Sequence, residues 1–254
     1  MPSGRKSYDA RLALTPQPSL AGSRSAILPL PGKSEFPSSP ALSSSLLQLE
    51  LSLAACVVDL QGITNIIRSD IGLTAQLLRL AASELEESPP PLTAVSEIIL
   101  HLGVDKLRVL VTRTEPLQGH SAYHARSCAC LRFWMHSRLT AMIAEELAAQ
   151  SCEIHPEEAY LAGLLFHLGD LPLLMGWIPG SKAADARHTG YAVAKAWRLP
   201  RTLLEVIAAD HELCSRKSRV LLDIVLAADA WASRLRFLAT RESAKIAQGS
   251  RLTH

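Results

Sequence analysis

The sequence has 254 residues, of which 48% are hydrophobic and only 5% aromatic, and its net charge at pH 7 is +2. The length permits a substantial core, and a core built from Leu, Ala, Ile and Val favours helices because Leu and Ala lose little side-chain freedom in them. The whole-chain charge argues neither for nor against a polyanionic partner. No apolar run approaches the roughly 20 residues of a membrane-spanning helix.

The charge is concentrated at the two ends of the sequence. Residues 1–48 carry +3 and residues 234–254 carry +4, so the centre carries −5 once both are subtracted from +2. Basic ends around an acidic centre are usually solvated tails. We therefore expect no nucleic-acid interface. Because both ends are basic, nucleic-acid binding is nevertheless the third hypothesis.

Residues 1–44 contain seven of the 15 prolines and many serines. Such a segment has little apolar surface to offset the entropy lost on ordering. It is expected to be a disordered or loosely docked arm. Because it is polar and proline-rich where a signal peptide would be apolar, the protein is expected to be cytoplasmic.

Helical periodicity begins at Leu46 and continues through the chain. Residues 46–60 are apolar on most faces and predict a buried helix. Residues 61–83 predict two helices separated by a turn at Asp70–Gly72. A helix starting near Thr93 is expected to stop at Gly103, and residues 104–113 add a further turn or two.

The C-terminal half is also predicted to be helical. A long helix is expected over roughly 122–150, and Pro156 is placed to open the next helix, which Gly169 and Pro172 bend or end. Two further helices are separated by Pro200, and a long amphipathic helix is expected over roughly 217–239. No stretch alternates as a strand would, so the predicted class is all-α.

Several common sites are missing from the sequence. It contains no Walker loop, no G-x-G-x-x-G turn and no G-x-S-x-G elbow. The five cysteines form no disulfide or metal framework, since helical Cys128 and Cys130 diverge by about 200° and Cys152 with His155 has no second pair. We therefore expect reduced thiols and no cofactor.

Imidazole and carboxylate side chains are scattered over the C-terminal half, and together they offer the ligands that a divalent metal requires. The candidates are His136, His167, Asp170, His188, Asp210 and His211. His167 and Asp170 are three residues apart and would share a helical face. The alternative interpretation is that each histidine is a core residue with a satisfied ring nitrogen.

Six segments stand out in order along the chain. In the N-terminal half they are "ITNIIRSDIGLTAQLLRLAAS" and "TAVSEIILHLGVDKLRVLV"; in the C-terminal half they are "FWMHS", "LAGLLFHLGDLPLL", "HTGYAVAKAWRLP" and "LLEVIAADHE". Together they resemble the HDOD family, a branch of the HD superfamily. The resemblance covers about residues 45–215. It implies an HDOD domain over 45–239, with an N-terminal helical part (45–115) packed on an HD-like bundle (121–239), followed by a basic tail (240–254).

The resemblance also implies a function. HDOD proteins are bacterial, often act as regulatory or output modules, and are mostly regarded as lacking enzymatic activity. In HD phosphohydrolases a His-Asp pair binds metal and is typically followed by Ile-Gly-Lys. This sequence has Phe166 at the His position, His167 at the Asp position and Asp170 at the Lys position. His136 matches the first His, while His188 and Asp210–His211 match later polar positions.

The sequence therefore predicts a non-catalytic module of bacterial signal transduction that holds no metal and contacts a signalling protein of unknown identity. Phe166 is expected to fill the space between His136 and His188. The alternative is a residual metal-dependent phosphohydrolase acting on a nucleotide or phosphoester, with the six candidates above as its ligands.

Overall fold

The computed structural model describes residues 36–84, 94–151, 153–178, 186–210 and 214–249. All of them belong to one unit that spans Glu35–His254. Apart from an isolated bridge between Ala41 and Pro116, their regular elements are helices, which confirms the all-α class. Residues 1–35 of the expected arm lie outside the described residues.

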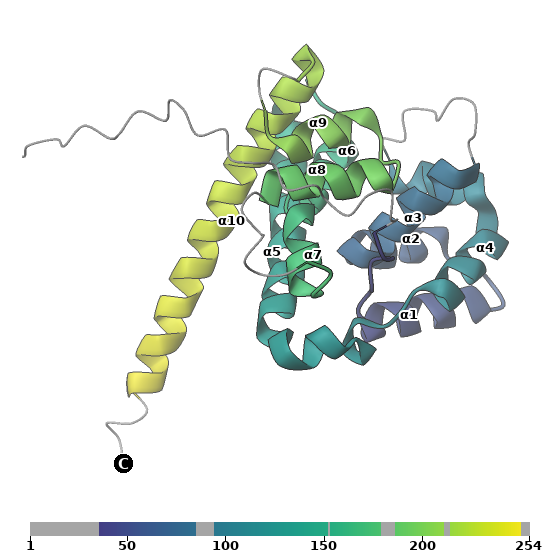
Figure 1. Ribbon diagram of the computed structural model, residues 1–254, viewed down its shortest axis with the longest axis horizontal. Helices are drawn as coiled ribbons and strands as arrows, with labels where there is room; N and C mark the ends of the chain where they lie inside the picture. Colours follow the sequence, from purple (N-terminus) through teal and green to yellow (C-terminus); the bar gives the residue numbers. More distant parts are fainter. Residues whose placement is uncertain (1–35, 85–93, 152, 179–185, 211–213, 250–254) are drawn as a thin grey trace, which may run out of the picture. The chain divides into compact units, whose positions relative to one another are not determined.

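Two groups of helices make up the described structure (Figure 1). The N-terminal group is α1 (Ser43–Ala54), α2 (Leu60–Arg68), α3 (Ile71–Glu84) and α4 (Val95–Arg113). The C-terminal group is α5 (Ser121–Ser151), α6 (Pro156–Leu165), α7 (Leu171–Leu174), α8 (Ala186–Ala196), α9 (Arg201–Ala208) and α10 (Arg216–Gly249). Two short 3-10 turns, η1 (Leu117–Gly119) and η2 (Leu168–Asp170), precede α5 and α7.

The structure confirms the turn predicted at Asp70–Gly72 and the helix break predicted at Gly103. Asp70 stands between α2 and α3, and its carboxylate accepts the backbone N–H of Gly72 and that of Leu73 at 2.8 and 3.3 Å. These donors are among those left unpaired at a helix start, so Asp70 caps α3. Gly103 interrupts α4 with a φ of 75°, a left-handed conformation that glycine adopts without strain.

The prediction that residues 46–60 form a buried helix is wrong in its burial. Leu49 and Leu53 are buried in α1, but Leu47 and Leu51 are 56% and 63% exposed. The reason is that α1 packs mainly on α2 and α4, so one face of the helix reaches the core. Because most faces of this helix are apolar, the sequence did not indicate which face is buried.

Residues 36–42, which precede α1, run as an extended segment that we call the strap. Its Ala41 N–H donates to the Glu115 carbonyl, and the Ala41 carbonyl accepts from the N–H of Leu117. The N–H of Leu42 donates to the Asp70 carboxylate at 2.8 Å. The strap is thereby fixed between the start of α3 and the end of α4.

In the C-terminal group, α5 packs on both α6 and α10. Pro156 opens α6 and Pro200 separates α8 from α9, as predicted. The last helix, α10, extends ten residues beyond the expected end at residue 239 and includes the first part of the expected tail. No helix among the described residues is long and apolar enough to cross a membrane.

Candidate His–His–Asp site

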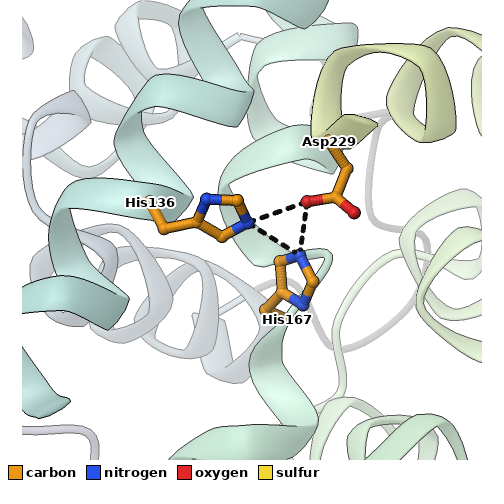
Figure 2. A group of neighbouring side chains, drawn as sticks. All are labelled: His136, His167 and Asp229. Carbon is orange, nitrogen blue, oxygen red and sulfur yellow. Dashed lines mark hydrogen bonds and ion pairs between the residues drawn. The ribbon is translucent and has the colours of Figure 1, made fainter. Parts of the chain in front are cut away.

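Three polar side chains from three separate elements converge at one point (Figure 2). His136 lies in α5, His167 precedes η2, and Asp229 lies in α10. The Asp229 Oδ1 atom is 2.8 Å from Nε2 of His136 and 2.9 Å from Nε2 of His167. The two Nε2 atoms are 3.3 Å apart. We call these residues the His–His–Asp cluster.

Close helix packing brings the three residues together. Gly163 of α6 lies so near α5 that a Cβ atom there would be 2.9 Å from the Cα atom of Ala141. This contact sets α6 against the helix that carries His136, and α6 ends just before His167. Since α10 packs on both α5 and α6, its Asp229 reaches both imidazoles.

The cluster is partly buried and carries one carboxylate. The side chain of His136 is 10% exposed, and those of His167 and Asp229 are each 26% exposed. Burial opposes ionisation of Asp229, but hydrogen bonds from His136 and His167 outweigh it and hold the pKa of Asp229 well below its usual range. Asp229 is therefore an ionised acceptor shared by two imidazoles.

The three contacts among Asp229 Oδ1 and the two Nε2 atoms cannot all be hydrogen bonds at once. When both Nε2 atoms donate to the ionised Oδ1, the 3.3 Å contact between them joins two donors. When one nitrogen gives up its proton to accept from the other, its lone pair faces the carboxylate oxygen instead. No assignment of two ring protons satisfies all three contacts.

Three lone pairs that face one point are also the arrangement of ligands around a metal ion. Zinc bonds of about 2.0–2.1 Å in tetrahedral geometry place neighbouring ligand atoms about 3.3 Å apart. The separation of the two Nε2 atoms matches that value, whereas the two N–O distances are about 0.4–0.5 Å shorter. The donors thus fit one ion after a small shift of the carboxylate. No other set of three such ligands shares this spacing in the described part of the chain.

The surroundings of the imidazoles are unequal. The Nδ1 atom of His136 is buried and has no hydrogen-bond partner among the described residues. A histidine bound to metal usually donates its other ring N–H to an oxygen, so His136 lacks the support that a metal ligand normally has. For His167, the oxygen near its Nδ1 is Oδ2 of Asp170, which lies 3.8 Å away and therefore beyond hydrogen-bonding distance.

Two cavities adjoin the cluster. One, of about 300 Å³, contains His136 and His167 and is bordered by Arg132 of α5 and Arg236 of α10. The other, of about 210 Å³, contains His167, Asp229 and Phe166. Asp170 lines both cavities.

The six residues predicted as metal ligands are distributed unevenly. His136 and His167 meet directly, and Asp170 approaches the far side of the His167 ring. His188 is exposed in α8 and Asp210 is exposed after α9, and neither belongs to the cluster. His211 lies outside the described residues.

The structure places His167, rather than Phe166, against His136. The Phe166 ring contacts the edge of the His167 ring, with centroids 5.1 Å apart, and lines only the second of the two cavities. Phe166 therefore does not lie between His136 and His167.

Sequence reasoning missed Asp229, which is 62 residues after His167. The available signal was a charged residue within the apolar stretch "LLDIVLAADAWASRL", on a predicted amphipathic helix. A carboxylate at the edge of an apolar face needs a partner, and here the two imidazoles provide it.

The HDOD domain family matches residues 39–179, more than half of the chain. Among solved structures, the chain is similar to the MmoQ response regulator of Methylococcus capsulatus str. Bath, with 19% identity, a TM-score of 0.62, and coverage of 78% of this chain and 87% of that one. It is similar to a Campylobacter jejuni virulence factor at 19% identity and a TM-score of 0.55, covering 75% and 77% of the two chains. At these identities the likeness shows the fold alone.

A Geobacter sulfurreducens HDOD domain protein has 21% identity over 78% of this chain and 74% of that chain, with a TM-score of 0.36. No match was found among curated proteins.

Proposed function

Because the chain belongs to the HDOD domain family, we propose that it is a regulatory module of a bacterial signalling system that acts through a partner protein and not by catalysis. The proposal starts from the family and from the all-α fold. The description of MmoQ as a response regulator supports a place in signalling. The proposal includes a cytoplasmic location.

One observation carries the non-catalytic part of the proposal: the His–His–Asp cluster contains a single carboxylate. A dinuclear hydrolytic site holds two divalent cations close together and needs several carboxylates to offset their charge. Here the position of the metal-binding Asp in the HD pair holds His167, which is neutral when it acts as a ligand. The preceding position holds Phe166, which offers no ligand atom.

The cluster has a structural role that needs no metal. Asp229 connects α10 to α5 through His136 and to the end of α6 through His167. Charge-assisted hydrogen bonds of this kind are about twice as strong as neutral ones. In this proposal the former ligand positions serve to hold three elements together, and the module presents a fixed surface to its partner.

The test is an activity assay with a matched variant. Purified protein is incubated with Mn²⁺ and with phosphomonoesters or cyclic dinucleotides, beside His136→Ala. We expect no turnover above that of the variant. Turnover by the wild-type protein that is lost in His136→Ala would overturn the proposal.

A second candidate function is a residual metal-dependent phosphohydrolase. The observation in its favour is that the ligand atoms of His136, His167 and Asp229 all lie within 4.8 Å of one another. These three residues would hold one ion, which would supply Lewis acidity toward a phosphoryl oxygen or water. Arg132, at the border of the adjoining cavity, would attract the phosphate. The assay above decides between the two functions.

A further inference from the structure

Large apolar side chains are exposed to solvent on two neighbouring helices of the C-terminal group. They are between 39% and 71% exposed, and we call them the α5–α10 face. Its members are Leu131, Met135 and Met142 of α5, and Trp231 and Leu235 of α10. Apolar surface that is gathered in one region, as distinct from a single exposed residue, marks a site of interaction.

On each helix these side chains form one stripe. At about 100° per residue, Leu131, Met135 and Met142 lie within about 40° of one another around α5. Trp231 and Leu235 are likewise about 40° apart around α10. Trp231 is two residues, and thus about 200°, from the α10 member of the His–His–Asp cluster. The stripe on α10 therefore points away from the cluster.

The two stripes lie at the same level along their helices. Asp229 of α10 contacts His136 of α5. Seven residues later, Arg236 lines the same cavity as Ala129, which is seven residues before His136. The two helices, which pack on one another, are therefore antiparallel here (Figure 1). The stripe on α10 is thus level with residues 131–135 of α5.

The stripe on α10 also lies on the side of that helix that borders α5. Leu226 of α10 lines a cavity together with Ile207 of α9. Leu235 is nine residues after Leu226, about 180° round the helix, and so lies on the side away from α9. Because α10 packs on α5 as well as on α9, the side away from α9 is the side next to α5.

The charged residues beside the stripes are basic. Arg132 and Arg138 are exposed on α5, and Arg234 is exposed on α10. The sequence contains no Asp or Glu from residue 131 to 142 or from residue 231 to 241. A second copy of the chain seated on this face would bring these arginines against one another, which opposes association, whereas an acidic partner would be attracted.

We propose that the α5–α10 face docks an acidic amphipathic helix of a partner protein. Two antiparallel helices offer a third helix a line along which to pack, and apolar residues spaced three and four apart on that helix meet both stripes. Methionine side chains adapt to the shape of such a helix. The inference rests on the proposed regulatory function, in which the module acts through a partner protein, and names the surface and the chemistry of that contact.

The test is a titration of the full chain into a dye-labelled synthetic peptide, followed by fluorescence anisotropy. The peptide is a helix of about 20 residues with Leu on one face and Glu on the others. We expect saturable binding that weakens at least about tenfold in Trp231→Ala and in Leu235→Ala, because each variant removes an apolar anchor. The matched control is Leu100→Ala, which removes a leucine exposed on α4 and should bind as the wild type does.

Two further measurements test the charge and the place of binding. A peptide with Lys at every Glu position should bind at least about tenfold more weakly than the acidic peptide. Docking of the acidic peptide, which contains no tryptophan, should shift the emission of Trp231 to shorter wavelength, and this shift should be absent in Trp231→Phe. Thermal unfolding of the alanine variants verifies that they are folded.

Several results would overturn the proposal. They are the absence of peptide binding, equal binding by the wild type and both alanine variants, and equal binding of the acidic and basic peptides. Self-association of the chain that is lost in Leu235→Ala, measured by sedimentation, would instead assign the face to a second copy. Binding to phosphatidylserine vesicles that is lost in Leu235→Ala, without binding of the peptide, would assign it to a membrane. None of these results changes the outcome of the activity assay, so the two proposals fail separately.

Discussion

Asp70 is fully buried, and its carboxylate joins three parts of the chain. It accepts the N–H of Leu42 in the strap, the N–H of Gly72 in α3, and the indole N–H of Trp134 in α5 at 3.0 Å. Burial raises the pKa of Asp70, and these donors act in the opposite direction. The sequence predicted a turn at this residue but gave no sign of the contact with α5, which is 64 residues away.

Replacing Asp70 with Asn tests this connection. The amide group would turn donors toward N–H groups that need acceptors, so we expect the free energy of unfolding to fall by about 3 kcal/mol in urea titrations. Asp105→Asn is the control, because the Asp105 side chain is 93% exposed and should change stability by less than about 0.5 kcal/mol. Equal stabilities of the two variants would show that Asp70 is not a structural centre.

Asp229 provides the corresponding test in the His–His–Asp cluster. Asp229→Ala removes the acceptor of both Nε2 atoms, and we expect it to lower the free energy of unfolding by about 2 kcal/mol in the presence of EDTA. The loss in EDTA is the informative part, because a metal-free connection between α10 and α5 predicts it. An effect that appears only after metal is added would contradict a structural role for the cluster.

At the scale of elements, local chemistry predicted helix boundaries better than burial or length. Pro156, Pro200 and Gly103 act on the backbone at their own positions, so their effects are readable from the sequence. The exposed face of α1 depends on which helices pack beside it, and such contacts lie outside the local sequence. The extension of α10 beyond residue 239 was missed although no glycine or proline stops the helix before Gly249.

The contact between α5 and α6 depends on Gly163. In an isolated helix Ala is preferred over Gly by about 1 kcal/mol, yet a Cβ atom here would press on the backbone of Ala141 and Thr140. We therefore expect Gly163→Ala to destabilise the protein by about 2 kcal/mol, measured by chemical denaturation. A stabilised variant would indicate that α6 moves away from α5 at little cost.

Glu205 connects α9 to the start of α10 and gives a pH-dependent prediction. Burial opposes its ionisation, but hydrogen bonds from Ser218, the Ser215 backbone N–H and Arg201 outweigh it and lower the pKa of Glu205. A lowered folded-state pKa stabilises the protein above the unfolded value of about 4.3, and this stabilisation is lost as pH falls through the folded pKa.

The measurement compares wild type with Glu205→Gln in urea unfolding at several pH values. The stability advantage of the wild type should be constant above about pH 5 and shrink toward acidic pH. An advantage that grows as pH falls would contradict the assigned charge of Glu205.

At the scale of the whole molecule, the sequence predicted the class, the order of most helices and two members of the site. His136 and His167 were identified because each lies in a segment that resembles a family motif. Asp229 was not, because its relation to them arises from the packing of α10 on α5 and α6. The expected ligands His188 and Asp210 resembled later family positions, but the fold does not bring them into the cluster.

The central claim is that this fold retains the helices of an HD-type site without the ligands for a dinuclear hydrolytic centre. Metal stoichiometry tests it most directly: the chain is dialysed to equilibrium against Mn²⁺ or Zn²⁺, and bound metal per chain is determined by elemental analysis beside His136→Ala. The account predicts no more than one ion per chain. Two ions held per wild-type chain and lost in His136→Ala would contradict it.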